Sequence, residues 1–296
     1  MPTSALVPTA TTLTLTPLAG TFAACVDDVH LPSVRGDDRR ERELRAALAR
    51  YKVLVFPAQH LDPDGLVAAG GVFGPVTAAH PVLPPLDPAH PEVLEIDATR
   101  SRLDARYRDE WENDTWHTDV SFMPDPPLGS VLQSVVAPPV GGDTAFADLQ
   151  AAYDRLSPRI RRLVDGLFAD HDGRAEFAAF LRDRPEGGSW GDRRFTVLEP
   201  VTHPVVRLHP VTGRPGLFVN PTFTTQIVGL APRESDRVLE LLYEASTQPE
   251  VTYRHRWSVG DVVVWDNRAT MHMGVRDFGD AHRVLHRVTI AGDPVS

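Results

Sequence analysis

The chain has 296 residues, of which 42% are hydrophobic and 24% charged, and this is the composition of an ordinary globular protein. No apolar run approaches the ~20 residues of a membrane span, and the N-terminal segment shows no secretory signal, so no membrane partner is expected. A net charge of −10 without a block of Lys and Arg argues against nucleic acid as a partner. The single cysteine, Cys25, cannot form an internal disulfide and favours a cytoplasmic location.

Short runs of β-branched and aromatic residues recur along the chain, with turn-forming residues between them. They predict strands at 12–16, 52–57, 93–97, 116–122, 129–136, 143–148, 205–209, 217–219, 251–257, 262–265 and 284–290. Apolar residues at helical spacing alternate with these runs. They predict helices at 38–51, 62–73, 149–168 (with a break at Ser157-Pro158) and 232–247. The second helix should begin at Asp62, because aspartate is a favourable N-cap and Pro63 suits the first helical position.

Many short strands with a few helices between them indicate a fold that is mainly β with helical insertions. A distorted double-stranded β-helix, or jelly roll, fits this pattern. We expect one domain over residues 1–296, with 1–11 as a loose N-terminal arm. The polar, glycine-containing segment 171–198 is expected to be an insertion that acts as an active-site lid.

The stretch 116–122 is predicted to carry the chemistry. Side chains alternate along a strand, so His117 and Asp119 should project from the same face. With His272 they would complete the two-histidine, one-carboxylate set that leaves one face of an octahedral ion open, as in non-haem Fe(II) oxygenases. From the residues alone, the alternative is an exposed polar pair that binds no metal.

The last predicted strand adds two cations. Arg283 and Arg287 should share one face, ~13 Å apart at ~3.3 Å per residue. A guanidinium can bind a carboxylate or another oxyanion through two parallel hydrogen bonds, so each arginine could hold a different anion. The alternative is a solvated charged face on an edge strand.

Several motifs occur in one order along the chain. They are His80-Pro81-Val82, Asn113-x-x-Trp116-His117-Thr118-Asp119, Gly141-Gly142-Asp143-Thr144, His203-Pro204-Val205-Val206-Arg207, Phe218-Val219-Asn220, Trp265-Asp266-Asn267-Arg268-x-Thr270-x-His272 and Arg283-x-x-x-Arg287. In this order and spacing, from about residue 12 to the C-terminus, the chain resembles the taurine/2,4-D dioxygenase (TauD/TfdA) family of Fe(II)- and 2-oxoglutarate-dependent enzymes.

The resemblance implies the cofactor-binding residues. His117, Asp119 and His272 would hold the iron and thereby form the catalytic centre. Arg283 and the hydroxyl of Thr144 would hold the distal carboxylate of 2-oxoglutarate. On sequence alone, Thr144 is better explained as a plain β-branched strand residue.

The resemblance also implies a substrate site. His80, Asn113 and Arg287 match positions that grip the anionic group of the substrate. Phe223, Phe177 and Leu83 match the pocket wall, although each phenylalanine alone would be read as a core residue.

The activity that the resemblance implies is hydroxylation of an unactivated C–H bond in a small anionic substrate, with O2 consumed and succinate and CO2 released. If the carbon bears a sulfonate or a sulfate oxygen, the product collapses to an aldehyde and releases sulfite or sulfate. An alkylsulfonate or alkyl sulfate is therefore expected. Leu83 stands where the family pattern has a tyrosine, and this more apolar wall argues against taurine itself.

Other functions fit the same residues. The enzyme could tailor a secondary metabolite or an amino-acid-derived substrate, or the chain could be a non-catalytic module that binds a metal and 2-oxoglutarate. A zinc hydrolase is disfavoured because no glutamate base is evident near the triad. By analogy with the family, a homo-oligomer, either a dimer or a tetramer, is expected.

Overall fold

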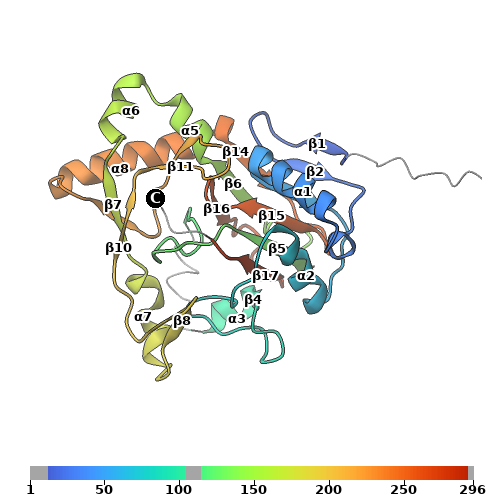
Figure 1. Ribbon diagram of the computed structural model, residues 1–296. Helices are drawn as coiled ribbons and strands as arrows, with labels where there is room; N and C mark the ends of the chain where they lie inside the picture. The colour runs from blue at the N-terminus through green and yellow to red at the C-terminus, as the bar shows by residue number, and fades with distance from the viewer. Residues whose placement is uncertain (1–12, 105–114, 293–296) are drawn as a thin grey trace, which may run out of the picture.

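The computed structural model describes residues 13–104 and 115–292, and most of its elements are strands (Figure 1). The largest sheet has seven strands in the order β1-β2-β3-β15-β5-β17-β4, and a second sheet has the order β14-β6-β16. Smaller sheets are β10-β7-β13, β11-β12 and β8-β9. The strands are β1 (Leu15–Pro17), β2 (Ala24–Val26), β3 (Val53–Phe56), β4 (Val93–Asp97), β5 (Gly129–Val136), β6 (Thr144–Asp148), β7 (Phe168–His171), β8 (Gly188–Trp190), β9 (Arg193–Phe195), β10 (Val201–Pro204), β11 (Val206–Leu208), β12 (Pro215–Leu217), β13 (Thr224–Ile227), β14 (Thr252–His255), β15 (Val262–Asp266), β16 (Thr270–Gly274) and β17 (Val284–Ile290). The helices are η1 (Leu31–Val34), α1 (Asp38–Tyr51), α2 (Pro63–Phe73), α3 (Ala98–Leu103), α5 (Leu149–Arg155), α6 (Pro158–Val164), α7 (Arg174–Arg182), α8 (Pro232–Ser246) and η3 (Pro249–Val251).

Helices α1 and α2 cover one face of the seven-stranded sheet, on the right of Figure 1. Leu44 and Leu48 of α1 and Leu66 of α2 share a buried cluster with Leu54 of β3 and Val264 of β15. Burying these side chains supplies the main driving force for packing the helices on the sheet. The helix-bearing face is therefore closed, and the site must lie on the other face.

The other face of the large sheet packs against β14-β6-β16. Phe146 of β6 shares a buried cluster with Val263 and Trp265 of β15 and Leu285 of β17. On β16, His272 packs against the rings of Trp265 and Phe146, at centroid distances of 4.6 and 6.0 Å. The two sheets thus enclose a core, and His272 lies inside it.

A third layer covers the outer face of β14-β6-β16. Ala147 of β6 and Met271 of β16 form a buried cluster with Leu149 of α5 and with Leu239 and Leu242 of α8. Helices α5, α6 and α8 form the upper left of Figure 1. This layer makes β16 a central element, so the position of His272 is held from both sides.

Most predicted elements are confirmed. Helices α1, α2 and α8 lie where the helical spacing places them, and Asp62 caps α2 by accepting the N–H of Gly65 at 2.8 Å. The helical region 149–168 breaks at the predicted point into α5 and α6, but its last residue, Phe168, already begins β7. The predicted arm 1–11 lies outside the described residues.

The predicted strand at 116–122 is wrong. Only His117 makes a β-bridge, to His272, and the chain then turns. Val120 has a φ of 54°, which lies in the left-handed region and ends any extended run. Strand β16, which carries His272, was not among the predicted strands.

The segment 171–198 contains helix α7 and the hairpin β8-β9, at the lower left of Figure 1. Its role as a lid stays a prediction. Within the described ranges, no helix combines the length and the apolar character that crossing a bilayer demands.

Candidate active site

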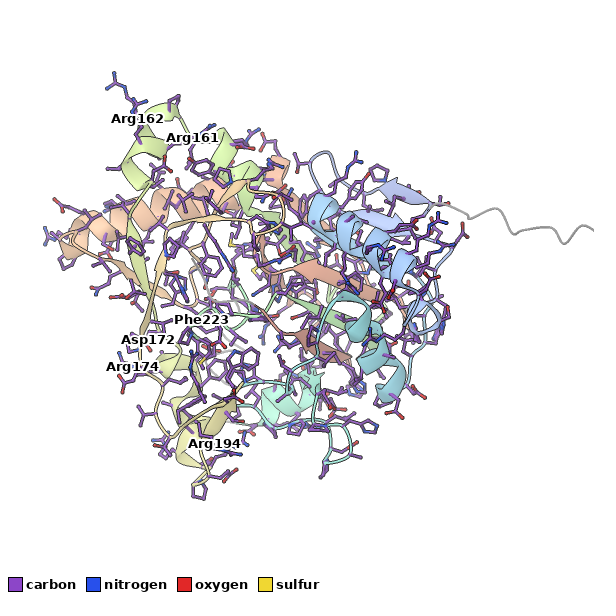
Figure 2. The ribbon with its side chains drawn as sticks, in the orientation of Figure 1. Arg161, Arg162, Asp172, Arg174, Arg194 and Phe223 are labelled. Atoms are coloured by element: carbon purple, nitrogen blue, oxygen red, sulfur yellow. The ribbon has the colours of Figure 1, made fainter. Side chains whose placement is uncertain are left out.

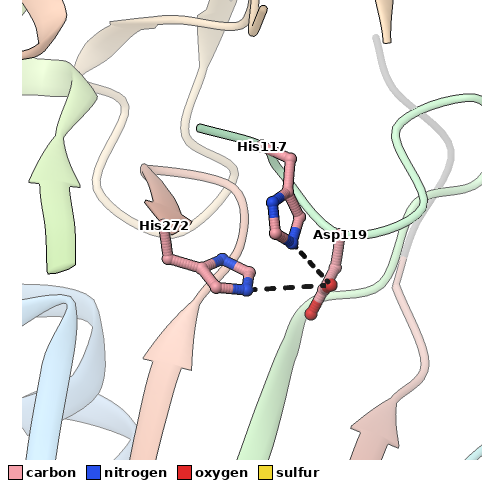
Figure 3. A group of neighbouring side chains, drawn as sticks. All are labelled: His117, Asp119 and His272. Carbon is pink, nitrogen blue, oxygen red and sulfur yellow. Dashed lines mark ion pairs between the residues drawn. The ribbon is translucent and has the colours of Figure 1, made fainter. Parts of the chain in front are cut away.

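Three side chains converge on a common point at the edge of the core (Figure 3). Oδ1 of Asp119 lies 3.9 Å from Nε2 of His117 and 3.9 Å from Nε2 of His272. These separations are too long for hydrogen bonds. The three ligand atoms lie within 4.8 Å of one another, so they face a space that one metal ion could fill. The predicted triad is therefore brought together.

The donor set fits a metal by its protonation as well as its geometry. Nδ1 of His117 lies 3.0 Å from the carbonyl oxygen of Thr115, which can only accept, so the ring proton is on Nδ1 and the lone pair is on Nε2. Burial and the nearby His117 lower the pKa of His272 to about 3, so its imidazole is neutral at pH 7. A neutral imidazole is the form that binds a metal.

Asp119 is kept ionised by its neighbours. Burial raises the pKa of this carboxyl, but Arg287, His272 and His117 together hold it well below its usual range. Nη1 of Arg287 donates to Oδ1 at 2.7 Å, and the Ser130 hydroxyl donates to Oδ2 at 2.8 Å. The carboxylate is thus charged, oriented and 4% exposed.

Hydrogen bonds from the Asn267 side chain fix the backbone of Asp119, although Asp119 lies in a turn and not in a strand. Its side-chain Oδ1 accepts the backbone N–H of Asp119, and its Nδ2 donates to the backbone carbonyl of Asp119, both at 2.9 Å. Asn220 and His203 also donate hydrogen bonds to this turn, to Ser121 Oγ and to the Met123 carbonyl. These bonds hold the left-handed backbone of the turn in place.

The predicted 2-oxoglutarate residues lie together on one side of the triad. Nη2 of Arg283 lies 3.5 Å from Oγ1 of Thr144, and its Nε donates to the carbonyl of Gly142 at 2.9 Å. The indole N–H of Trp257 donates to Oγ1 of Thr144 at 3.0 Å. With two donors directed at the oxygen, the Thr144 hydroxyl proton is left to bind an incoming anion.

The predicted substrate residues divide into two groups. His80, Arg287, Phe223, Phe177 and Leu83 all line the cavity that contains the triad. Asn113 lies outside the described residues.

His80 is held in one tautomer. Its Nδ1 accepts the backbone N–H groups of Val82 and Leu83 at 3.1 and 3.0 Å. Burial, with Arg287 nearby, holds the pKa of His80 well below its ordinary value, so the ring is neutral and its proton must sit on Nε2. His80 therefore offers one N–H donor and no charge.

One part of the cavity wall is apolar. It includes Leu83, Leu94, Ile96, Phe122, Phe177 and Phe223. Phe223 is 5% exposed and lies near the centre of the view in Figure 2, whereas Arg162 of α6 lies at the outer edge of the molecule. The Phe223 ring lies 6.4 Å from the His117 ring and 4.9 Å from the Phe122 ring, between centroids. An apolar part of a substrate would therefore lie directly beside the triad.

Sequence reasoning missed Ser130, Trp257 and Phe122. Ser130 and Trp257 donate hydrogen bonds to site residues that are distant from them in the sequence. No local sequence pattern distinguishes either of them from a core residue. Asn267 belongs to one of the sequence motifs, but the motif alone does not predict its contact with Asp119.

Similarity to known proteins agrees with this geometry. A family model, "Taurine catabolism dioxygenase TauD, TfdA family", matches residues 14–289. The chain is 37% identical to an alpha-ketoglutarate-dependent sulfate ester dioxygenase of Pseudomonas putida, over 98% of this chain and 93% of that protein. It is 33% identical to an alkylsulfatase of Acinetobacter baylyi, over 95% of this chain and 86% of that protein.

A solved structure extends the likeness to the fold. The crystal structure of AAD-2 in complex with Mn(II) and N-oxalylglycine has a TM-score of 0.77 and 28% identity, over 97% of this chain and 100% of that chain. Two observations agree: the family model matches nearly the whole chain, and the side chains of His117, Asp119 and His272 come together in the structure. The chain therefore belongs to the TauD/TfdA family of dioxygenases, which depend on Fe(II), 2-oxoglutarate and O2.

Proposed function

We propose that this enzyme hydroxylates the carbon next to the ester oxygen of an alkyl sulfate and thereby releases sulfate and an aldehyde. The proposal rests mainly on one cavity that combines the triad, the buried Arg283 and Arg287, a neutral histidine donor and an apolar part of the wall. The sulfate-ester relatives support this substrate class over a sulfonate. An alkylsulfonate, with sulfite released, is the nearest competitor.

Different residues of the cavity would bind the metal, 2-oxoglutarate and the alkyl sulfate. His117, Asp119 and His272 would hold Fe(II), and Arg283 with the Thr144 hydroxyl would hold the distal carboxylate of 2-oxoglutarate. When bound, the iron would supply the oxidising chemistry by which O2, 2-oxoglutarate and a substrate C–H bond give succinate, CO2 and a hydroxylated carbon. Arg287 and His80 are left for the sulfate.

The chemistry of His80 and Arg287 suits a sulfate monoester. Such an ester carries one negative charge and three terminal oxygen acceptors, which one guanidinium and one neutral N–H donor can satisfy. Arg287 has a buried Nε that finds no hydrogen-bond partner among the described residues. This unused donor is a reason to expect an anion beside it.

The apolar wall suits the alkyl part of the substrate. Leu83 and Phe177 offer no hydrogen bond to an ammonium or hydroxyl group, whereas burial of each CH2 contributes about 0.8 kcal/mol. We therefore expect longer alkyl chains to bind more tightly until the cavity is filled.

We further propose a jelly-roll arrangement for the two facing sheets, a homodimer or homotetramer, and a cytoplasmic location. The strand order and the family support the jelly-roll arrangement. Family analogy supports the oligomer, and the single cysteine supports the cytoplasmic location. The segment 171–198 is proposed as the lid, because Phe177 of α7 lines the cavity.

The test is succinate formation by the Fe(II)-loaded enzyme with 2-oxoglutarate and O2, across linear alkyl sulfates, the matching alkylsulfonates and alkyl carboxylates. We expect the alkyl sulfates to stimulate succinate formation most, with sulfate released in equal amount. Tight coupling to a carboxylate or to an amino-acid-derived substrate would replace the substrate proposal. Absence of any succinate, with metal and 2-oxoglutarate bound, would instead identify a non-catalytic binding module.

A further inference from the structure

The two oxygens of the Asp119 carboxylate have different surroundings. Oδ1 lies 3.9 Å from Nε2 of both triad histidines and also accepts Nη1 of Arg287. Oδ2 accepts only the hydroxyl of Ser130, at 2.8 Å, among the hydrogen bonds of the described residues. One oxygen therefore faces the metal position, and the other is tied to strand β5.

Ser130 is a rigid donor. It is fully buried on β5, and its backbone lies between Trp265 of β15 and Thr289 of β17 in the seven-stranded sheet. Leu132, two residues on and so on the same face, lines the cavity. The sheet thus fixes the direction from which Ser130 reaches Asp119.

Without this hydroxyl the carboxylate would have a competing partner. Asn267 holds the backbone of Asp119, so the side-chain torsions are the freedom that remains. A guanidinium pairs with a carboxylate most strongly when it binds both oxygens. Arg287 is already at 2.7 Å from Oδ1, so a carboxylate released from Ser130 could rotate into a two-oxygen pair with Arg287.

We propose that Ser130 is a positioning residue that keeps Oδ1 of Asp119 directed at the metal and prevents a two-oxygen ion pair with Arg287. The proposal rests on the assignment of His117, Asp119 and His272 as the metal ligands. Partners that orient metal ligands typically change metal affinity by 10–100-fold when removed. A hydroxyl that served only the core would leave metal affinity unchanged.

The experiment compares the Mn(II) affinity of Ser130→Ala with that of Ser134→Ala. Each metal-free variant is titrated with Mn(II), and binding is monitored by electron paramagnetic resonance. Ser134 is a matched control because it lies on the same strand, is 1% exposed, and its hydroxyl has no hydrogen-bond partner among the described residues. We expect Ser130→Ala to weaken Mn(II) binding about 10–100-fold and Ser134→Ala to leave it unchanged. The free energy of unfolding of each metal-free variant is measured beside it.

A second pair removes any ambiguity from packing or failed folding. Ser130→Thr keeps the hydroxyl and adds a methyl group. Ser130→Val has the same shape as the threonine variant but carries a methyl group in place of the hydroxyl. We expect the threonine variant to bind Mn(II) more tightly than the valine variant by a similar factor. Equal affinities within both pairs would overturn the role of Ser130, whereas failure of the unmodified enzyme to bind Mn(II) would overturn the triad assignment itself.

Discussion

At the scale of single residues, the tautomer of His80 gives the sharpest test of the substrate site. His80→Asn places an amide oxygen where Nδ1 accepts the Val82 and Leu83 N–H groups, but it removes the Nε2 donor. A hydrogen bond to a charged group contributes about 1.5–3 kcal/mol, so KM for the alkyl sulfate should rise about 10–100-fold. KM for 2-oxoglutarate should stay within about twofold. Steady-state kinetics with each substrate varied decides this, and a parallel rise of both KM values would contradict the assignment.

Trp257 provides a second residue-scale prediction, for the cosubstrate. Its indole N–H occupies one acceptor position of Thr144 Oγ1. In the proposed site, the hydroxyl proton then remains to bind the 2-oxoglutarate carboxylate. Trp257→Phe removes this N–H and keeps most of the ring, so KM for 2-oxoglutarate should rise about fivefold, which is ~1 kcal/mol. Alkyl sulfate affinity, measured at saturating 2-oxoglutarate, serves as the control. An unchanged 2-oxoglutarate KM would show that Thr144 does not need this partner.

Arg287 modifies the simple division of labour between the two arginines. The sequence predicts one anion for each, but the structure also places Arg287 against Asp119, the proposed carboxylate ligand of the metal. Substitution of Arg287 should therefore disturb both the substrate and the metal, whereas substitution of Arg283 should affect mainly 2-oxoglutarate.

At the scale of elements, a buried ion pair joins the end of α1 to the start of α5. Lys52, the C-cap of α1, donates from Nζ to Oδ2 of Asp148 at 2.8 Å, and the two side chains are 2% and 1% exposed. Asp148 also caps α5 by accepting the N–H groups of Gln150 and Ala151. The pair therefore ties the helix layer on the large sheet to the helix layer outside the second sheet.

Lys52→Met should destabilise the protein by about 3–5 kcal/mol, because it leaves a buried carboxylate without its partner. The double variant Lys52→Met/Asp148→Asn should recover much of that loss, since asparagine removes the charge and remains a good N-cap. Denaturant unfolding of the metal-free protein measures both free energies. A loss below about 1 kcal/mol in the single variant would contradict the prediction.

At the scale of the whole molecule, buried histidines set the acid side of the stability profile. Burial and the neighbouring His203 lower the pKa of His171 to about 3. The folded state therefore leaves His171 neutral at pH 5.5, whereas the unfolded chain, with a pKa near 6.5, takes up the proton. Stability is full above about pH 6.5 and falls as the pH drops below it.

For this histidine the loss between pH 7.5 and pH 5.5 is about 1.4 kcal/mol. His171→Asn keeps an amide that can reach Ser121 but does not titrate, so its stability should fall by about 1.4 kcal/mol less over the same interval. Denaturant titrations of the metal-free protein at the two pH values give the comparison. An identical pH dependence in both proteins would show that His171 is not held neutral.

The chain by itself determined the chemistry and most of the framework. Helices α1, α2 and α8 could be predicted because apolar spacing and local caps such as Asp62 depend on neighbours in the sequence. The grouping of His117, Asp119 and His272 could be predicted because few residue types bind iron and their order matches a known family.

Only the tertiary structure decided how those ligands are held. β-Branched and aromatic residues favour a strand at 116–122, but contacts from 148 residues away, made by Asn267, stabilise a turn with Val120 in a left-handed conformation. Likewise, only the fold brings the Ser130 hydroxyl to Asp119 and the Trp257 indole N–H to Thr144, and their proposed roles depend on these contacts. Local propensity is worth tenths of a kcal/mol per residue, so long-range hydrogen bonds that satisfy buried polar groups override it.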